Sequence, residues 1–110
     1  MSNLLHRQCQ ALEGGEPMSE SQIRHHLAEV NGWHLNQGAI EKTFSFKNFY
    51  ETVAFVNALA WICHAEDHHP ELRVTYDHCV VRFSTHSVGG ISRNDFICAA
   101  KVDELVHFVA

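Results

Sequence analysis

Basic residues are scarce in this 110-residue sequence, and it contains no long apolar run. Eight Lys and Arg stand against thirteen Asp and Glu, which gives a formal charge of −5. The chain therefore lacks the clustered positive charge that neutralises a phosphate backbone or an anionic membrane surface. No apolar run approaches the roughly 20 residues of a membrane-spanning helix, and the first residues lack the apolar region of a signal peptide. We expect a cytoplasmic protein that binds neither nucleic acid directly nor membranes.

Cysteine is also sparse, and none of the four cysteines forms a C-x-x-C pair of the kind found in zinc and redox sites. Cys63, Cys79 and Cys98 lie among apolar residues, so we expect them to be small core side chains. Cys9 lies outside any periodic segment, and we expect it to be a free surface thiol. A chain of this length can bury a sufficient core without disulfides.

Histidine, by contrast, is abundant. The ten histidines outnumber Lys and Arg together, and the unperturbed pKa of a histidine side chain is about 6.5. Histidine can therefore donate or accept a proton near neutral pH, and we look for the functional site among these residues.

Hydrophobic periodicity predicts two helices in the first part of the chain. Ser19 and Gln22 form a capping box that starts the first helix, whose apolar stripe continues toward Gly32. Asn48 can cap a second, longer helix with a wide apolar stripe. This helix must end ahead of Pro70, because a proline disfavours the α conformation in the residue before it.

Alternating apolar and polar residues predict four strands in two hairpins, over residues 33–35, 40–47, 72–76 and 79–86. A third helix follows the capping-box-like pair Ser92 and Asp95 and runs to the C-terminus. The element order is α-β-β-α-β-β-α. Each strand has one apolar face, which favours an α+β fold in which a four-stranded antiparallel sheet carries the helices on one face.

We divide the chain into two parts. Residues 1–17 lack sustained periodicity and contain Gly14, Gly15 and Pro17, so we expect a poorly ordered leader. Residues 18–110 then form a single domain.

Four histidines occupy positions suited to a site. His68 and His69 lie where the buried helix breaks, His86 lies at the end of the last strand, and His64 precedes His68 by one helical turn. Helix breaks and strand ends are places where side chains can face a cavity. We therefore hypothesise that the fold brings His86 close to His68 and His69.

These residues form a spaced pattern that resembles the signature of the pterin-4a-carbinolamine dehydratases. The pattern is His64-x3-His68-His69-Pro70-x5-Tyr76-x9-His86-x8-Asp95. The run of residues 84–86 and the stretch of residues 92–96 also fit that signature. The resemblance covers about residues 19–109, and the predicted element order agrees with the α+β fold of that family.

The resemblance implies roles for individual side chains. By similarity His68 and His86 are acid/base catalysts, and His69 binds and orients the pterin. His64 stands where the family often has a glutamate that supports the site. Asp95 has a supporting role near the pterin, and Ser84 and Thr85 join the substrate-binding group.

The resemblance also implies a reaction, the dehydration of a 4a-hydroxytetrahydropterin to a quinonoid dihydropterin in tetrahydrobiopterin recycling for aromatic amino-acid hydroxylation. The reaction needs one proton delivered and one removed, which suits a pair of histidines. It requires no cofactor or metal, because the pterin is the substrate. Members of that family form dimers or tetramers, so we expect a homodimer or homotetramer.

Two alternatives remain. The first is a protein-binding module, since family members in animals also act as a dimerisation cofactor of a transcription factor through an exposed apolar helix face. The second is a metal site, because His64 and His68 have the i, i+4 spacing of two zinc ligands on one helix. The glutamate of the H-E-x-x-H motif is absent between them.

Overall fold

The computed structural model describes residues 4–12 and 15–109. Its elements in chain order are the short 3-10 helix η1 (Leu4–His6), α1 (Glu20–Leu27), β1 (His34–Asn36), β2 (Ala39–Ser45), α2 (Phe49–Glu66), β3 (Glu71–Val74), β4 (His78–Phe83), the 3-10 helix η2 (His86–Val88) and α3 (Arg93–Val109). The predicted order of three helices and four strands is confirmed. In the part of the chain that the structure describes, no helix is long and apolar enough to cross a membrane.

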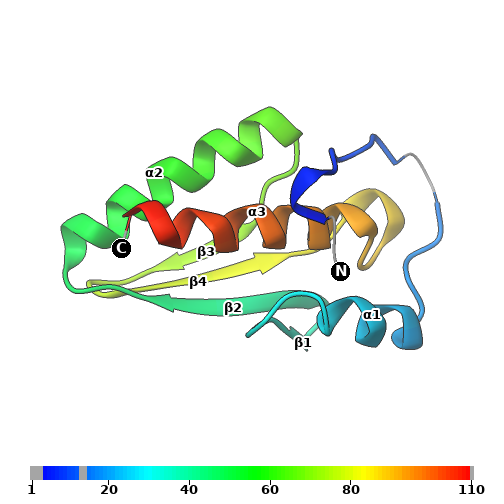
Figure 1. The fold of residues 1–110 in the computed structure, drawn as a ribbon. Helices are drawn as coiled ribbons and strands as arrows, with labels where there is room; N and C mark the ends of the chain where they lie inside the picture. The colour runs from blue at the N-terminus through cyan, green and yellow to red at the C-terminus, as the bar shows by residue number, and fades with distance from the viewer. Residues whose placement is uncertain (1–3, 13–14, 110) are drawn as a thin grey trace.

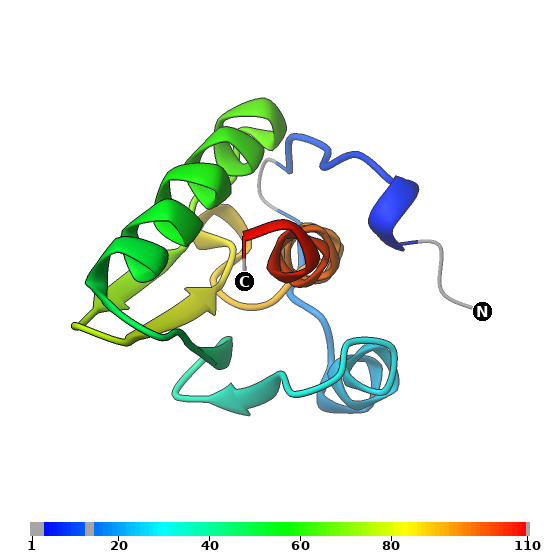
Figure 2. The same ribbon diagram turned by 60° about the vertical axis from the view of Figure 1, so that its left-hand side comes forward.

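The four strands form one antiparallel sheet in the order β1-β2-β4-β3. Figures 1 and 2 show α2 and α3 covering one face of this sheet, with α1 beside α3 on the same side. The strand residues beneath the helices are buried, among them Ile40, Phe44, Cys79, Val81 and Phe83. The predicted α+β architecture, with helices on one face, is therefore confirmed.

The core lies between the sheet and the helices α2 and α3. Phe55 of α2 is completely buried and packs on Phe44 and Phe46 of the second strand and the turn after it, with ring centroids 4.8 and 5.0 Å apart. The helix begins as predicted, with the Asn48 side chain accepting a hydrogen bond from the Glu51 N–H at 2.9 Å. Aromatic packing and the cap together fix the direction in which α2 crosses the sheet.

The first helix is shorter than predicted. Its capping box is present, with the Gln22 N–H donating to Ser19 Oγ and the Ser19 N–H donating to Gln22 Oε1. The helix ends at Leu27 instead of continuing toward Gly32. The Val30 N–H then donates to the Leu27 carbonyl, so the chain tightens into turns. These turns bury Val30 without a further helical turn.

The segment ahead of the predicted domain makes specific contacts, in contrast to the poorly ordered leader expected there. Leu4 is buried, and the Leu5 carbonyl accepts a hydrogen bond from Lys101 Nζ at 2.9 Å. The Gln10 N–H donates to Asn94 Oδ1, and Asn94 Nδ2 donates to the Gln10 carbonyl. Residues 4–12 therefore pack against α2 and α3. All these partners are distant in sequence, so local periodicity could not indicate them.

Candidate active site

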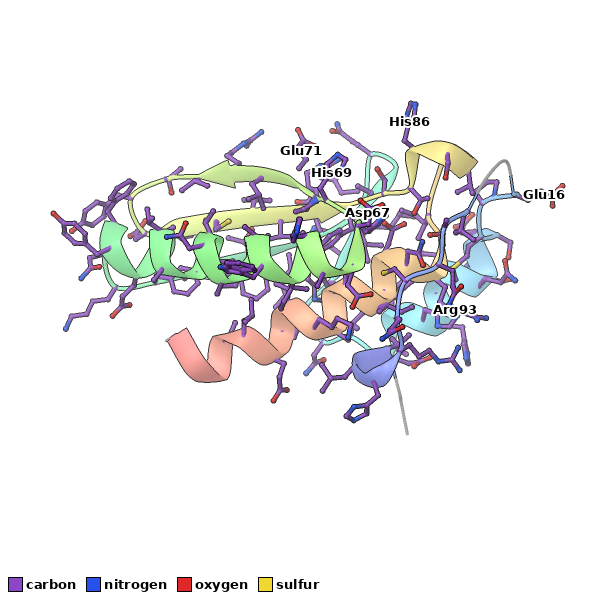
Figure 3. The ribbon with its side chains drawn as sticks, turned by 90° about the horizontal axis from the view of Figure 1, so that it is seen from above. Glu16, Asp67, His69, Glu71, His86 and Arg93 are labelled. Atoms are coloured by element: carbon purple, nitrogen blue, oxygen red, sulfur yellow. The ribbon has the colours of Figure 1, made fainter. Side chains whose placement is uncertain are left out.

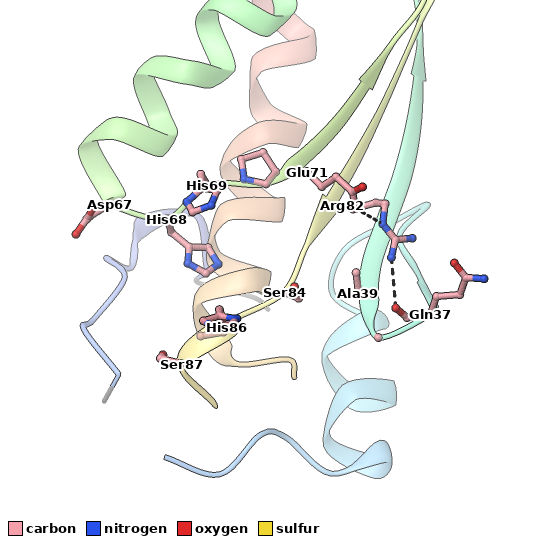
Figure 4. Close-up of a pocket in the computed structure, with 13 residues that line it drawn as sticks. Gln37, Ala39, Asp67, His68, His69, Glu71, Arg82, Ser84, His86 and Ser87 are labelled. Carbon is pink, nitrogen blue, oxygen red and sulfur yellow. Dashed lines mark hydrogen bonds and ion pairs between the residues drawn. The ribbon is translucent and has the colours of Figure 1, made fainter. Parts of the chain in front are cut away.

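A cleft of about 590 Å³ opens at one end of the sheet. Three parts of the chain form its walls: the segment after α2, the turn between β1 and β2, and the end of β4 with the loop that follows. Figure 4 shows the side chains around it. The lining residues are Gln37, Gly38, Ala39, Asp67, His68, His69, Pro70, Glu71, Arg82, Ser84, Thr85, His86 and Ser87.

The end of α2 directs two histidines into this cleft. Asp67 follows the last helical residue in a left-handed conformation, with φ 52° and ψ 46°. The His68 N–H donates to the Cys63 carbonyl at 3.1 Å, which closes the last turn. Pro70 then prevents any return to helix. As a result His68 and His69 leave the helix side by side and both line the cleft.

His68 is the most constrained of the site histidines. Its Nε2 lies 2.6 Å from Asp95 Oδ1, and its ring stacks on Phe83 with centroids 5.8 Å apart and an angle of 10° between the planes. Only 12% of its side chain is exposed. Because a carboxylate accepts hydrogen bonds, we assign the proton to Nε2. The Nδ1 atom is then the nitrogen available for chemistry.

Asp95 is fully buried and lies behind His68. Its second oxygen accepts hydrogen bonds from Thr85 Oγ1 and from the Ser92 N–H, each at 2.8 Å. The Ser92 hydroxyl lies 2.6 Å from Thr85 Oγ1 and accepts from the Asn94 N–H. The carboxylate therefore helps to cap α3, as the Ser92 and Asp95 pair predicted, and it also holds His68.

Two residues of the predicted substrate-binding group, Asp95 and Thr85, differ in their access to the cleft. Both were expected to bind substrate; Asp95 is fully buried and does not line the cleft, whereas Thr85 lines the cleft although only 5% of it is exposed. Burial leaves the Asp95 carboxylate no access to a molecule in the cleft. Asp95 contacts His68 directly, and Thr85 donates a hydrogen bond to Asp95.

His86 and Ser84 lie on the wall opposite the end of α2, and both are exposed. His86 begins η2, directly after Thr85, whose N–H donates to the Gly90 carbonyl at 2.7 Å. This backbone bond closes the loop of residues 85–90 and fixes where His86 emerges. The side chains of His68, His69 and His86 all line this cleft (Figure 4), and His86 projects outward from η2 at its rim (Figure 3). The hypothesis that the fold brings these histidines together therefore agrees with the geometry.

His64 does not join this group. It is exposed on α2, where its ring lies edge-on to Trp61 with centroids 6.4 Å apart. His68 meanwhile directs Nε2 to Asp95, which leaves only its Nδ1 atom for a further contact. Among residues 4–12 and 15–109, no group of three or more His, Cys, Asp or Glu side chains is arranged to hold a metal ion.

Tyr76 of the signature also lies away from the cleft. It is exposed in the turn between β3 and β4, and its carbonyl accepts a hydrogen bond from Thr52 Oγ1 in the first turn of α2. The cleft lies at the other end of α2. Tyr76 therefore does not line the cleft, and its backbone carbonyl supports the start of α2.

A charged network that the sequence did not reveal forms the remaining wall. Arg82 Nε donates to Glu71 Oε1 at 3.0 Å, and the guanidinium also bonds to Glu41 and to the Gln37 carbonyl. The Asn36 side chain and Arg82 both donate to Glu41 and hold the pKa of its carboxyl below the usual range. The strand register accounts for the network, since Glu41 and Glu71 both pair with Arg82.

Comparisons with known proteins agree with this geometry. The family model described as pterin 4 alpha carbinolamine dehydratase matches residues 16–105. A protein of Stenotrophomonas maltophilia strain R551-3 is 54% identical over 105 residues, covering 93% of this chain and 90% of the relative. A protein of Nitrosospira multiformis is 49% identical over 106 residues, covering 96% and 94%. Both are provisionally named pterin-4-alpha-carbinolamine dehydratases.

A solved structure shows the same fold. The crystal structure of a transcriptional coactivator/pterin dehydratase from Brucella melitensis superposes with a TM-score of 0.78 at 29% identity. The match covers 82% of this chain and 98% of the other. Fold and cleft thus define an α+β protein with a histidine-lined site at the end of an antiparallel sheet. The chain belongs to the pterin-4-alpha-carbinolamine dehydratase family, whose members are hydro-lyases.

Proposed function

We propose that this protein dehydrates 4a-hydroxytetrahydropterins by histidine acid/base catalysis. One observation carries the proposal: His68, held by the buried carboxylate of Asp95, shares a cleft with the exposed His86. The cleft volume of about 590 Å³ falls within the range of sites that bind small molecules. A bicyclic pterin is a molecule of suitable size.

The reaction needs two proton transfers. A proton leaves N5 of the pterin, and the C4a–O bond breaks as the departing hydroxyl receives a proton and leaves as water. The product is the quinonoid dihydropterin, with a new double bond between C4a and N5. Of His68 and His86, one accepts the proton from N5 and the other donates a proton to the departing hydroxyl. An imidazole group suits both tasks, because its ordinary pKa lies near neutral pH. His69 and Ser84, both exposed in the cleft, orient the pterin ring.

The test is a stopped-flow assay in which the carbinolamine is generated and its absorbance decay is followed with and without the protein. We expect the decay to accelerate in proportion to protein concentration. The carbinolamine also dehydrates spontaneously, so the rate in buffer alone is the baseline. A decay that stays at this baseline over a wide range of protein concentration would overturn the proposed function.

The Arg82 network is expected to support substrate binding more than turnover. By donating to the Gln37 carbonyl, Arg82 holds the turn that faces the histidines. Arg82→Met should raise the KM about fivefold, equivalent to about 1 kcal/mol, with a kcat within about twofold of wild type. Arg82→Lys should recover part of the loss. Steady-state kinetics check this, with Arg73→Met, on the adjacent strand, as the control; a fall in kcat alone would contradict it.

We also propose that the chain associates into a homodimer or homotetramer. The outer strands β1 and β3 each pair on one side only within the described residues, and such edges favour pairing with another chain. Trp61 and Tyr50 of α2 are 76% and 82% exposed, so an apolar surface lies on the helix as well. Sedimentation at micromolar concentration should show an oligomer, and a monomer would overturn this point.

The same exposed aromatic side chains favour the second candidate, a protein-binding role. Trp61 lies on the outer side of α2 and contacts His64, which is not in the cleft. A partner bound there would leave the catalytic histidines accessible. If this role exists, Trp61→Ala will weaken partner capture while the dehydration rate stays unchanged, and His68→Ala will do the reverse.

A further inference from the structure

Two cysteines that are 89 positions apart in the sequence meet in the structure. The Sγ atoms of Cys9 and Cys98 lie 3.6 Å apart, within the distance of a hydrogen bond between two thiols. Cys98 is fully buried in α3, whereas Cys9 is half-buried in the segment that packs along this helix. Cys9 is therefore a free thiol, as expected, but it is half-buried because the segment around it is docked on the fold.

The contact between the two thiols is held from both sides. The Cys9 N–H donates to Glu66 Oε1 of α2 at 2.7 Å. The next residue, Gln10, exchanges two hydrogen bonds with the side chain of Asn94 in α3. Cys9 Sγ also lies 3.6 Å from the Asn94 carbonyl. These bonds keep the Cys9 thiol next to Cys98. The effective concentration of one thiol near the other is therefore high.

We propose that Cys9 and Cys98 form a site of reversible thiol oxidation, at which a disulfide fastens residues 4–12 to α3. Bond formation must shorten the separation from 3.6 Å to about 2.05 Å. Cys98 is held within a helix, but Cys9 lies in irregular backbone beyond η1. A shift of this size is therefore accommodated on the Cys9 side, without deformation of the core.

A peroxide supplies the oxidising power. Cys9 is the thiol that solvent reaches, so its thiolate attacks hydrogen peroxide and becomes a sulfenic acid as one water is released. Cys98 then attacks the Cys9 sulfur, the S–S bond forms and a second water leaves. Two thiols lose two electrons and two protons in total, and the peroxide is reduced to water. A small thiol reductant reverses the reaction by exchange.

The order of the two steps follows from the surroundings of the thiols. The hydrogen bond with Cys9 and burial together raise the pKa of Cys98, which disfavours its thiolate in the reduced protein. Burial also raises the pKa of Cys63 and of Cys79 to about 11. Because the thiolate is the form that attacks a peroxide, Cys63, Cys79 and Cys98 react with free peroxide more slowly than the accessible Cys9. Oxidation is thus directed to Cys9.

Peptide mapping of the full chain gives the decisive test, because the four cysteines fall in four different tryptic peptides, residues 8–24, 48–73, 74–82 and 94–101. The reduced protein is treated with equimolar hydrogen peroxide, and free thiols are alkylated. We expect a monomer about 2 Da lighter, from the loss of two hydrogen atoms. Peptide 8–24 should be linked to peptide 94–101, and dithiothreitol should release the link.

Thermal unfolding supplies a second readout. A bond across so long a loop restricts the unfolded chain, so oxidation should raise the Tm by about 5–15 °C. Cys9→Ser should abolish both the link and the shift, while its hydroxyl can still donate to the Asn94 carbonyl. Cys79→Ala is the matched control, since it removes a buried thiol outside the pair and should retain both effects.

Three results would overturn the proposal. One is a link from either peptide to residues 48–73, which would mean that Cys63 is the partner. Another is a disulfide found only between two chains. The third is oxygen addition at Cys9 with no link to Cys98, which would show that the two thiols do not react with each other.

Discussion

Asp95→Asn is expected to slow carbinolamine dehydration at least about tenfold, because the asparagine side chain cannot reproduce three accepted hydrogen bonds. Asp95 accepts from His68 Nε2, Thr85 Oγ1 and the Ser92 N–H. If the new NH₂ group faces His68, it donates to Nε2 and forces the ring proton onto Nδ1. If it faces Ser92, two donors oppose each other at a buried position. In either orientation His68 loses its tautomer or its support.

The same substitution is expected to lower the free energy of unfolding by about 2 kcal/mol, because a buried donor or acceptor is left unsatisfied. Urea unfolding gives the stability, and stopped-flow kinetics on the folded fraction give the rate. Asp103→Asn is the matched control: Asp103 lies on the same helix and accepts from Trp33 Nε1 and Lys42 Nζ. The control should lose stability and keep its rate. A rate for Asp95→Asn within threefold of wild type would contradict a positioning role.

The second large effect concerns the two histidines that we propose transfer protons. His68→Ala and His86→Ala should each lower kcat at least tenfold, since positioned acid/base catalysis contributes about 10²–10⁴-fold and spontaneous dehydration sets a floor. His68→Ala also removes a ring that stacks on Phe83, so the free energy of unfolding of this variant should fall. His86 is exposed, so its removal should change the free energy of unfolding little.

Stopped-flow rates of both variants are compared with those of His78→Ala. His78 is an exposed histidine outside the cleft that pairs with Asp77 at 2.6 Å. Circular dichroism confirms that each variant is folded. If His86→Ala turned over as fast as His78→Ala, the cleft histidines would have no special part in the reaction.

The sequence predicted the architecture because this fold depends on local signals. The capping box at Ser19, the cap at Asn48 and the alternation in each strand all agree with one arrangement, and the structure contains it. The length of the first helix was overestimated. Val30 has the spacing of a helical stripe, but a turn buries it, and the spacing alone does not distinguish the two cases. The docking of residues 4–12 depends on α2 and α3, which local periodicity does not report.

The part of the site that local sequence signals indicate was also predicted. Pro70 indicated the helix break that presents His68 and His69, and the strand end indicated His86. The signature grouped Asp95 with these histidines. It did not show that Asp95 is buried behind His68, because the spacing of residues along the sequence does not report how deeply a side chain is buried. In the sequence, Arg82 is a polar residue that alternates with the apolar residues of its strand, which is typical of a side chain that faces away from the core. Only the strand register brings it to Glu41, Glu71 and the turn at Gln37.

The most direct test of the central claim is the dehydration rate of the His68→Ala/His86→Ala double variant, measured by stopped flow beside the two single variants. If the two histidines act as one proton-transfer unit, removing the second histidine after the first lowers the dehydration rate only slightly. The double variant should then lie within about threefold of the slower single variant. A loss equal to the product of the two single losses would show that the histidines act independently, and would contradict the mechanism.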